Sequence, residues 1–433
     1  MRDRLLQKIA EKTARVGVIG MGYVGLPLAV EFAKIGFSVI GIDTDRERVG
    51  KLKNGISYIP DVDSNEITRL IHENRFRATD DFGVIAELDT MNICVPTPLR
   101  KTRDPDLSYI LAAVEMIKKH LHRGQLVILE STTYPGTTQE ILLPMLSETG
   151  LKVGEDFFLA FSPERVDPGN KEFTTKNIPK VVGGITPACR EAAGTLYRQC
   201  LETVVFVSST QAAELVKLLE NTFRNVNIAL VNEMALMCHN LDIDVWEVIG
   251  AARTKPFGFM PFYPGPGIGG HCIPVDPGYL SWKAKLNGFE PRLIDLASQI
   301  NAGMPHFVVN KIGEILNDWG KSIKGSKVHL LGVAYKSNIG DTRESPAYDV
   351  AKILLQRGAV LSYSDPHVPE FNVNGCRLKD MGGQPAVLEA ADCTVIITHH
   401  DRFDYAGIVR HARVIFDTRN AMGGLDSPKI VRL

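Results

Sequence analysis

Short apolar runs alternate with helical patterns in the first half of the chain. Residues 15–20, RVGVIG, form an apolar run that ends in glycine, which is typical of a buried strand. Residues 26–36 place apolar side chains at helical spacing, and residues 37–43 predict a second strand. The runs at 90–98 and 125–132 repeat the strand pattern. Because strands and helices alternate, we expect a parallel sheet with helices on both faces.

The strand pattern is absent between about residues 210 and 305. Residues 211–242 contain neither proline nor glycine, and their apolar spacing predicts one long helix. Strand patterns return at residues 327–335, 359–366, 393–400 and 413–420, with a helix beginning near Pro346. We therefore expect an α/β protein in which two Rossmann-like, doubly wound domains, residues 1–208 and 306–433, flank a central all-helical region, residues 209–305.

Composition narrows the classes of partner. A chain of 433 residues is too long for one ordinary hydrophobic core. Its formal net charge of −1 gives no strong positive potential that would attract nucleic acid or an anionic membrane. The seven cysteines include no C-x-x-C pair, so we expect neither a disulfide framework nor a metal site, and a cytoplasmic location fits. Neither a signal peptide nor an apolar run long enough to span a membrane is predicted.

The first strand-to-helix turn carries a dinucleotide fingerprint. Gly20, Gly22 and Gly25 form G-x-G-x-x-G between a predicted strand and a predicted helix, where the turn can approach a pyrophosphate. Asp43 ends the second strand, where its carboxylate can accept both ribose hydroxyls and would repel a 2′-phosphate. This pattern predicts NAD rather than NADP. Arg48 has two interpretations, a contact with the adenosine or a solvated helix position.

The stretch PGPGIGGHCIPVD, residues 264–276, presents Cys272 in a loop whose glycines leave room for a bulky substrate. A thiolate that adds to an aldehyde gives a thiohemiacetal, which can lose a further hydride and leave a thioester for hydrolysis. His271 is adjacent, but neighbours on an extended loop point apart, so Asp276 is the better candidate base. The alternative is a small buried cysteine that only fills space.

Polar residues elsewhere have both functional and structural interpretations. Lys217 and Asn221 are four residues apart on the predicted long helix, where they could hold an oxyanion or simply form a solvated face. Glu164 lies in a proline-bounded turn after a strand and could orient a hydrolytic water, or be a turn carboxylate. Thr132 and Thr133 end another strand, where they could reach the nicotinamide or cap a helix.

Taken together, separated motifs resemble a known family. From about residue 15 to residue 420 the chain is similar to the nucleotide-sugar 6-dehydrogenases of the UDP-glucose/GDP-mannose dehydrogenase family. The motifs are GVIGMGYVGLPLA, VPTP, ESTTYPGTT, SPERVDPG, ELVKLLENTFRNVNIAL, PGPGIGGHCIPVDP and LGVAYKSNIGDTRESPA. The resemblance implies an NAD-dependent, four-electron oxidation of a UDP-sugar at C6 to a uronic acid.

The resemblance also implies residue roles. The implied nucleophile is Cys272, which carries the thioester. Lys217 and Asn221 are implied to stabilise the oxyanion. Asp276 and Glu164 are implied to assist proton transfer and water activation, and Thr132 completes the catalytic set. The implied cofactor residues are Gly20, Gly22, Tyr23, Val24, Gly25, Asp43, Arg48, Thr97, Thr132 and Arg343. The implied substrate residues are Glu164, Arg165, Lys217, Asn221, Arg253, Tyr263, Gly269 and Lys336, with Arg253 reaching across a dimer interface.

Two departures narrow the substrate. Ile273 follows the cysteine where UDP-glucose dehydrogenases typically have phenylalanine, and PFYPGPG replaces their aromatic and basic segment. Both features resemble the branch that oxidises UDP-N-acetylhexosamines for surface polysaccharides. We expect UDP-N-acetylglucosamine, with UDP-N-acetylmannosamine, UDP-N-acetylgalactosamine and UDP-glucose as alternatives, since one inverted hydroxyl changes few contacts.

Two other functions stay open at this point. A two-electron hydroxyacid dehydrogenase on a similar plan would need no cysteine. A nucleotide-sugar-binding protein that has lost catalysis would keep the fold without the chemistry. In either case the helical middle predicts a homodimer or a larger homo-oligomer.

Overall fold

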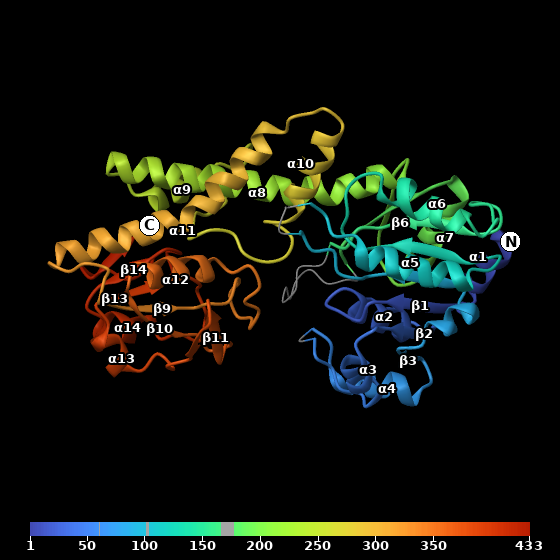
Figure 1. The fold of residues 1–433 in the computed structure, drawn as a ribbon, viewed down its shortest axis with the longest axis horizontal. Helices are drawn as coiled ribbons and strands as arrows, with labels where there is room; N and C mark the ends of the chain where they lie inside the picture. The colour runs from blue at the N-terminus through green and yellow to red at the C-terminus, as the bar shows by residue number, and fades with distance from the viewer. Residues whose placement is uncertain (60, 101–103, 166–176) are drawn as a thin grey trace. The chain divides into compact units, whose positions relative to one another are not determined.

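The computed structural model describes residues 1–59, 61–100, 104–165 and 177–433 (Figure 1). The chain forms two compact units, each of which is described by itself. Unit 1 comprises residues 1–220 and 282–287, and unit 2 comprises residues 221–281 and 288–433. Helix α8, Thr210–Leu241, is continuous and contributes residues to both units. The three-part division expected from the sequence stays a prediction.

Unit 1 is built on an eight-stranded sheet with the order β3-β2-β1-β4-β5-β6-β7-β8. The strands are β1 Arg15–Ile19, β2 Ser38–Ile42, β3 Phe76–Thr79, β4 Thr90–Ile93, β5 Leu126–Leu129, β6 Phe158–Phe161, β7 Lys180–Gly184 and β8 Val204–Phe206. Neighbouring strands are parallel except β6 and β7. The order from β3 to β6 is that of dinucleotide-binding folds, whose switch point lies between β1 and β4.

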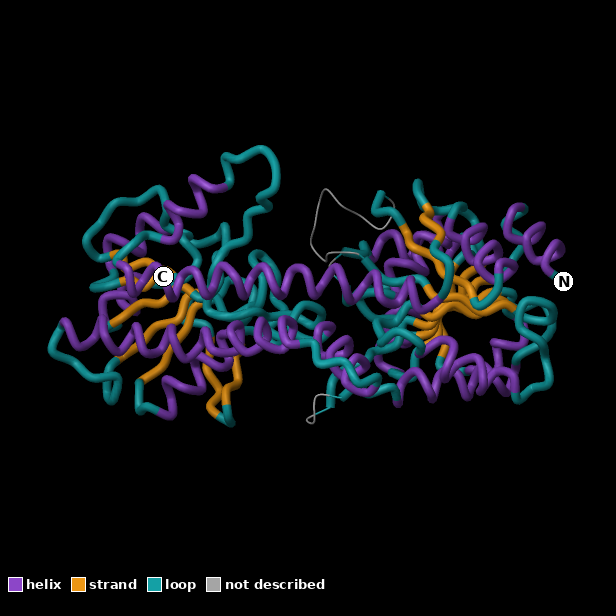
Figure 2. The backbone as a smooth tube through the Cα atoms, turned by 90° about the horizontal axis from the view of Figure 1, so that it is seen from above, coloured by secondary structure: helices purple, strands orange, loops and turns teal. Residues whose placement is uncertain are grey.

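Helices enclose this sheet, as Figure 2 shows. They are α1 Arg2–Ala10, α2 Gly25–Lys34, α3 Arg46–Lys53, α4 Ser64–His72, the 3₁₀ helix Phe82–Glu87, α5 Ser108–His120, the π-helical turn Thr138–Leu142, α6 Leu143–Ser147 and α7 Pro187–Tyr197. One core cluster joins Val18 of β1 to Phe32 of α2 and Leu196 of α7. Strands β4, β5 and β6 are buried along their whole length, as expected for strands covered on both faces.

Unit 2 contains a second, fully parallel sheet with the order β10-β9-β13-β14-β15. Its strands are β9 Lys327–Leu331, β10 Val360–Ser364, β13 Cys393–Ile396, β14 Ile415–Asp417 and β15 Ile430–Arg432, and an antiparallel hairpin is formed by β11 Glu370–Val373 and β12 Cys376–Lys379. Helix α12, Pro346–Gln356, packs in one core cluster, and α13, Pro385–Ala390, and α14, Tyr405–His411, pack in another.

The middle of the chain is helical, which confirms the expected fold class. Four helices follow one another: α8, α9 Val245–Ala252, α10 Asp276–Leu286 and α11 Arg292–Asp318. Helix α11 continues past residue 305 with Pro305 buried inside it, and its Val308 and Ile312 belong to the core of the second sheet. The last helix therefore forms part of a sheet-covering layer as well as of the middle region.

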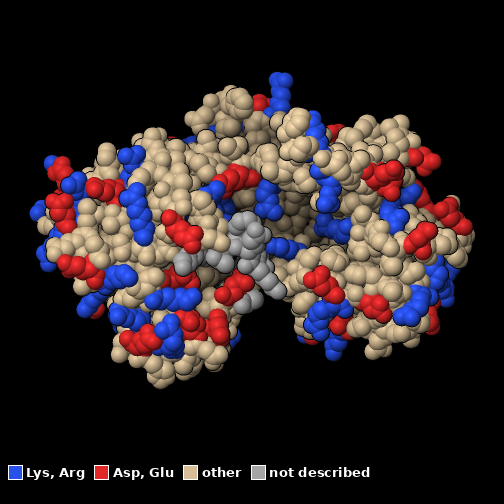
Figure 3. All heavy atoms as spheres, turned by 180° about the vertical axis from the view of Figure 1, so that it is seen from behind, with Lys and Arg blue, Asp and Glu red and all other residues tan. Residues whose placement is uncertain are grey.

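Acidic and basic side chains are interspersed over the face of the molecule in Figure 3, in keeping with the net charge of −1. Within the described residues, no helix is both long and apolar enough to cross a bilayer.

Candidate active site

The glycine fingerprint of unit 1 forms a close-packed turn. Gly20 has a φ of +94°, and a Cβ atom there would lie 2.7 Å from the carbonyl oxygen of Cys94. A Cβ at Gly25, where α2 begins, would collide with the Gly20 carbonyl oxygen. Gly22, in contrast, has no neighbour within 4 Å of a Cβ among the described residues, so the turn is open beside it. Tyr23 and Val24 complete this turn, whose shape suits a pyrophosphate.

Asp43 is buried at the end of β2 and holds the same turn. Its Oδ2 accepts a hydrogen bond from the Met21 N–H at 2.8 Å, and its Oδ1 accepts one from the Asp45 N–H at 2.9 Å. Each oxygen keeps a second lone pair for a ribose hydroxyl. Arg48 lies 3.9 Å from Asp43 Oδ2 and over the ring of Tyr58, whose hydroxyl donates to the Met21 carbonyl oxygen. Of the two interpretations of Arg48, this position favours the one beside the adenosine.

The loops that follow β4 and β5 are tied to each other. The Ser131 hydroxyl donates to the Val95 carbonyl oxygen at 2.7 Å. Thr97 and Thr132 are half-buried on these two loops, whereas Thr133 is buried and hydrogen-bonded to Thr137 at 2.6 Å. Thr132 is therefore the threonine that can reach a ligand, while Thr133 holds the loop.

A buried carboxylate that the sequence analysis missed holds the segment after this loop. Glu214 of α8 accepts hydrogen bonds from the Gly136 N–H at 2.6 Å and from the N–H and hydroxyl of Thr138 at 2.9 and 2.7 Å. Burial raises the pKa of Glu214 to about 7, although these donors offset part of the effect. The sequence shows a carboxylate in the largely apolar stretch around residue 214, but its partners, Gly136 and Thr138, lie far away in the sequence.

Glu164 and Arg165 follow β6, and their side chains differ in role. Glu164 is half-buried, and its Oε1 accepts from the Arg165 N–H at 2.8 Å. The Arg165 guanidinium pairs with both carboxylate oxygens of Glu220 on α8, at 2.7 and 3.3 Å. This pairing anchors the loop to α8, and the role of Arg165 at the substrate stays a prediction. Residues 166–169 of the SPERVDPG motif lie outside the described residues.

Lys217 is 8% exposed on α8, one helical turn before Asn221. In the part of the chain that the structure describes, no carboxylate or other hydrogen-bond partner engages its ammonium group. A buried cation without a protein partner is costly. Its position therefore suits a group that meets a negative charge in the course of a reaction.

A second network that sequence analysis missed lies beneath Thr132. Glu130, at the end of β5, accepts from Lys180 Nζ at 2.6 Å, from the Tyr197 hydroxyl at 2.7 Å and from Asn92 Nδ2 at 2.6 Å. Burial acts to lower the pKa of Lys180, but negative groups that include the Glu130 and Glu164 carboxylates together outweigh it, and the pKa is raised. The network fixes the residue that leads into the Thr132 loop.

In unit 2, Cys272 is exposed four residues before α10 begins at Asp276. Its carbonyl oxygen accepts from the Asp276 N–H at 2.8 Å, so a hydrogen-bonded turn joins Cys272 to the start of that helix. Asp276 is buried, and its Oδ2 accepts from Asn221 Nδ2 at 2.5 Å. The structure thus brings Asn221, Cys272 and Asp276 together.

Asparagines on α8 hold both ends of the loop that carries the thiol. We call residues 264–272 the glycine loop. Asn232 Oδ1 accepts from the Gly265 N–H at 3.0 Å, and Asn225 Nδ2 donates to the Ile273 carbonyl oxygen at 3.3 Å. Neither residue was predicted, although Asn221, Asn225 and Asn232 recur on one face of the helix.

The middle of the glycine loop packs against residues 333–344, which we call the support segment. A Cβ at Gly269 would lie 2.7 Å from Tyr335 Cβ, and the Gly270 N–H donates to the Arg343 carbonyl oxygen at 3.3 Å. These glycines therefore allow close backbone packing, which explains their presence without a bulky substrate. Burial and the nearby Arg343 lower the pKa of His271.

The remaining predicted residues lie in unit 2. Lys336 is half-buried on the support segment, and the Arg343 guanidinium pairs with both oxygens of Asp341 at 2.6 to 2.9 Å. Arg253 and Tyr263 form an exposed cluster in which Arg253 Nη1 donates to the Tyr263 hydroxyl at 3.4 Å.

Arg419 was not predicted. It follows β14, its guanidinium lies against Gly265, and burial lowers its pKa to about 10. No group of three or more potential metal ligands occurs among the described residues.

Comparisons with known proteins agree along the chain. Models of the UDP-glucose/GDP-mannose dehydrogenase family match as an NAD binding domain at residues 14–201, a central domain at 211–303 and a UDP binding domain at 329–424. A UDP-N-acetyl-D-glucosamine 6-dehydrogenase from Pseudomonas aeruginosa is 38% identical over 359 residues, which cover 82% of this chain and 84% of that protein.

Archaeal relatives are similar over a longer span. A UDP-N-acetyl-D-mannosamine dehydrogenase from Pyrococcus horikoshii is 36% identical over 415 residues, covering 94% of this chain and 95% of that protein. A solved structure of a UDP-D-ManNAc dehydrogenase from Pyrococcus horikoshii superposes with a TM-score of 0.88 at 34% identity, covering 96% of this chain and 98% of that chain.

Proposed function

Because the chain belongs to the UDP-glucose/GDP-mannose dehydrogenase family and is an NAD-dependent UDP-sugar dehydrogenase, we propose that it oxidises a UDP-N-acetylhexosamine at C6 to the uronic acid. The observation that carries this proposal is the exposed Cys272 in the turn that leads into α10, with Asp276 buried at the end of that turn and held by Asn221. A two-electron alcohol dehydrogenase has no use for a presented thiol.

The residues divide the chemistry between them. NAD⁺, when bound at the glycine turn and Asp43, accepts hydride in each of the two oxidations. The Cys272 thiolate adds to C6 of the aldehyde, so that a C–S bond forms and the oxygen becomes a thiohemiacetal hydroxyl after it takes a proton. After the second oxidation the carbon is a thioester. Water then displaces the sulfur, which leaves as the thiolate and releases the carboxylate.

Charged and polar groups support these steps. Lys217 supplies an ammonium and Asn221 an amide N–H to the oxygen that becomes negative in thiolate addition and in hydrolysis. Glu164 takes a proton from the hydrolytic water, and Asp276 accepts the proton that the thiol gives up. Lys336 contacts the sugar and Arg343 the junction between cofactor and substrate, as the family resemblance implies.

UDP-N-acetylglucosamine is the substrate we favour. Ile273 after the cysteine supports an N-acetylhexosamine rather than UDP-glucose, and the relative from Pseudomonas aeruginosa is named for this sugar. UDP-N-acetylmannosamine is the second candidate, because the relative from Pyrococcus horikoshii is named for it. The product would serve surface polysaccharide synthesis. An NAD-dependent reaction that uses a reduced cysteine thiol suits the reducing cytoplasm.

We also propose a homodimer through α8. Large apolar side chains recur along one face of this helix, one or two helical turns apart, and are between 45% and 59% exposed. They are Phe223, Leu230, Met237 and Leu241. A row of large apolar side chains along one helix face is typical of a surface that a partner covers.

A panel of UDP-sugars tests the substrate. NADH formation is followed after addition of UDP-N-acetylglucosamine, UDP-N-acetylmannosamine, UDP-N-acetylgalactosamine or UDP-glucose, and we expect the highest kcat/KM with the first. Cys272→Ala should lose at least about 10³-fold in uronate formation. Cys376→Ala, which removes the other exposed cysteine, is the matched control and should keep wild-type activity.

Two results would contradict this proposal. Absence of NADH with every sugar would favour a nucleotide-sugar-binding protein without catalysis. Full uronate formation by Cys272→Ala would show that the thiol takes no part in the reaction.

A further inference from the structure

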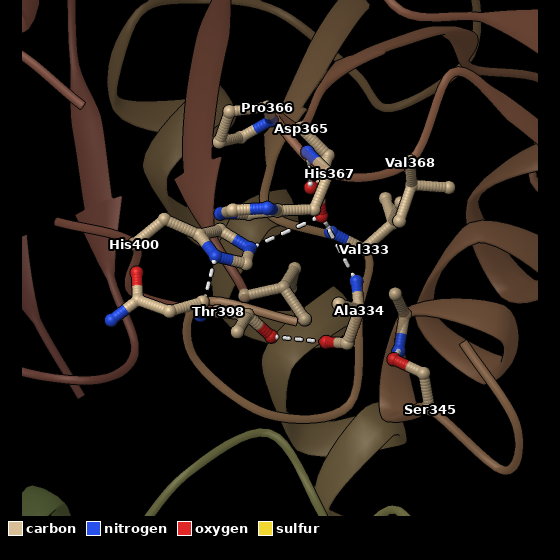
Figure 4. A network of polar contacts seen from close by, with 12 residues as sticks. Val333, Ala334, Ser345, Asp365, Pro366, His367, Val368, Thr398 and His400 are labelled. Atoms are coloured by element: carbon tan, nitrogen blue, oxygen red, sulfur yellow. Dashed lines mark hydrogen bonds and ion pairs between the residues drawn. The ribbon is translucent and has the colours of Figure 1, made fainter. Parts of the chain in front are cut away.

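A buried aspartate–histidine pair lies at the carboxyl ends of β10 and β13 (Figure 4). Asp365 follows β10, and its Oδ2 accepts from the Val333 and Ala334 N–H groups at 2.7 and 3.0 Å. The same oxygen accepts from His400 Nε2 at 3.1 Å. Neither side chain has exposed surface. The pair therefore binds the first residues of the support segment from within the fold.

The hydrogen bonds determine the protonation of the His400 ring. Nδ1 of His400 is 3.0 Å from the backbone nitrogen of Asn338, which can only donate. Nδ1 must therefore be the unprotonated acceptor, and the ring proton must lie on Nε2, where it is donated to Asp365. His400 thus joins the buried carboxylate at one end to the support segment at the other.

Hydrogen bonds hold Asn338 in a turn of the backbone. Its φ of +62° lies in the left-handed region, which asparagine adopts more readily than most residues other than glycine. Besides the bond to His400, the Asn338 side chain donates to Asp401 Oδ2 at 2.8 Å and accepts from the Asp401 N–H at 3.0 Å. Three hydrogen bonds to two consecutive residues hold this turn of the support segment.

The support segment in turn holds the glycine loop. A Cβ at Gly270 would lie 2.9 Å from the Tyr335 ring, and Gly270 itself is bonded to the Arg343 carbonyl oxygen. A shift of the segment by a fraction of an ångström would therefore move the loop that ends at Cys272. His400 thus holds Asn338, and Tyr335 of the same segment packs against the glycine loop.

The equivalent position in unit 1 shows that Asp365 is not a free ligand site. Asp43, at the end of β2, accepts one N–H on each oxygen. Asp365 accepts three donors on Oδ2 and the His367 N–H at 2.9 Å on Oδ1, so protein groups occupy the carboxylate. The His367 ring also lies 5.1 Å from the His400 ring. The Asp365 carboxylate is thus an internal support of unit 2.

We propose that His400 is a positioning residue: the hydrogen bond that its Nδ1 accepts from the Asn338 N–H holds the support segment in the place against which the Cys272 loop packs. The inference rests on the proposed function, because its effect on turnover requires Cys272 to be the nucleophile.

Two substitutions of similar size separate positioning from general stability. In His400→Asn, the new amide oxygen can take the place of Nδ1 and accept from the Asn338 N–H, but the hydrogen bond to Asp365 is lost. In His400→Gln, the new amide nitrogen can take the place of Nε2 and donate to Asp365, but the hydrogen bond from Asn338 is lost. Each removes one hydrogen bond and comparable volume, so their Tm values should fall alike. The control is His399→Gln, because His399 is the neighbouring, partly exposed histidine.

The kinetic constants of these variants then distinguish positioning by His400 from a general loss of stability. We expect His400→Gln to lower kcat for the UDP-sugar about tenfold or more with an unchanged KM for NAD⁺, whereas His400→Asn and His399→Gln stay within about threefold of wild type. Equal losses in both His400 variants, or wild-type kcat in both, would overturn the proposal.

A second measurement does not depend on the reaction. The rate at which iodoacetamide alkylates Cys272 is followed by peptide mass spectrometry, with Cys376 of the same unit as the internal standard. We expect a change of at least about threefold at Cys272 in His400→Gln and none at Cys376. An unchanged Cys272 rate overturns the inference. An inactive wild-type protein whose Cys272 rate does respond overturns only the proposed function.

Discussion

Among the single residues, Glu214 shows most directly how burial controls a side chain. The pKa of this carboxyl is about 7, against an ordinary 4.5. Glu140 and Tyr134, which face it from the neighbouring segment, add no positive charge, and Lys283 is paired with Glu140 at 2.7 Å. Between pH 4.5 and 7 the folded chain thus holds a proton that the unfolded chain has released. The contribution of Glu214 to the free energy of unfolding must therefore fall as the pH rises through this window.

We expect Glu214→Gln to lose this dependence. Urea denaturation at a series of pH values should show the free energy of unfolding of the variant rising, relative to wild type, by about 3 kcal/mol between pH 4.5 and about pH 8. Glu148→Gln, which changes an exposed carboxylate that does not act on Glu214, should keep the wild-type slope. Parallel curves for wild type and Glu214→Gln would refute the assignment.

The sequence predicts the role of a residue where the local backbone leaves room for only one residue type. Gly20 and Gly25 are such positions, since a Cβ at either meets backbone. Glu214 and Asn232 could not be predicted with the same rules, because their partners lie far away in the sequence, at Gly136 and Gly265. Only the folded chain shows which distant N–H group a buried carboxylate or amide will meet.

At the scale of elements, α8 combines two faces with different tasks. Asn221, Asn225 and Asn232 face the thiol loop, whereas Phe223, Leu230, Met237 and Leu241 are exposed. The length of this helix was predicted because neither proline nor glycine interrupts residues 211–242. Strands β3 and β8 were not predicted, because each is short and lies at an edge of the sheet, where one side is partly solvated.

The exposed face of α8 predicts an oligomer that charge can disrupt. We expect the double variant Leu230→Asp/Met237→Asp to change the mass measured by light scattering at micromolar concentration from dimer to monomer, because two buried carboxylates would oppose association. Asn240→Asp, an exposed change on the same helix but off this face, should stay dimeric. A monomeric wild-type protein, or a double variant that remains dimeric, would exclude this interface.

At the scale of the whole molecule, the fold class followed from the sequence and the reaction did not. Alternating strands and helices at both ends predicted two parallel sheets, and both are present. The proposed reaction draws on Asp43, Thr132 and Lys217 of unit 1 and on Asn221 and Cys272 of unit 2. Their joint action in one reaction cycle could not be predicted from the spacing of motifs, because the residues lie on separate elements far apart along the chain.

The number of hydrides removed from each sugar tests this central claim most directly. Wild-type protein is given a limiting amount of UDP-N-acetylglucosamine and excess NAD⁺, and NADH is counted against sugar consumed and uronate formed. Capture of the aldehyde by Cys272 predicts two NADH for each uronate, with no free aldehyde. One NADH for each sugar consumed, with the aldehyde or its hydrate as product, would contradict the account.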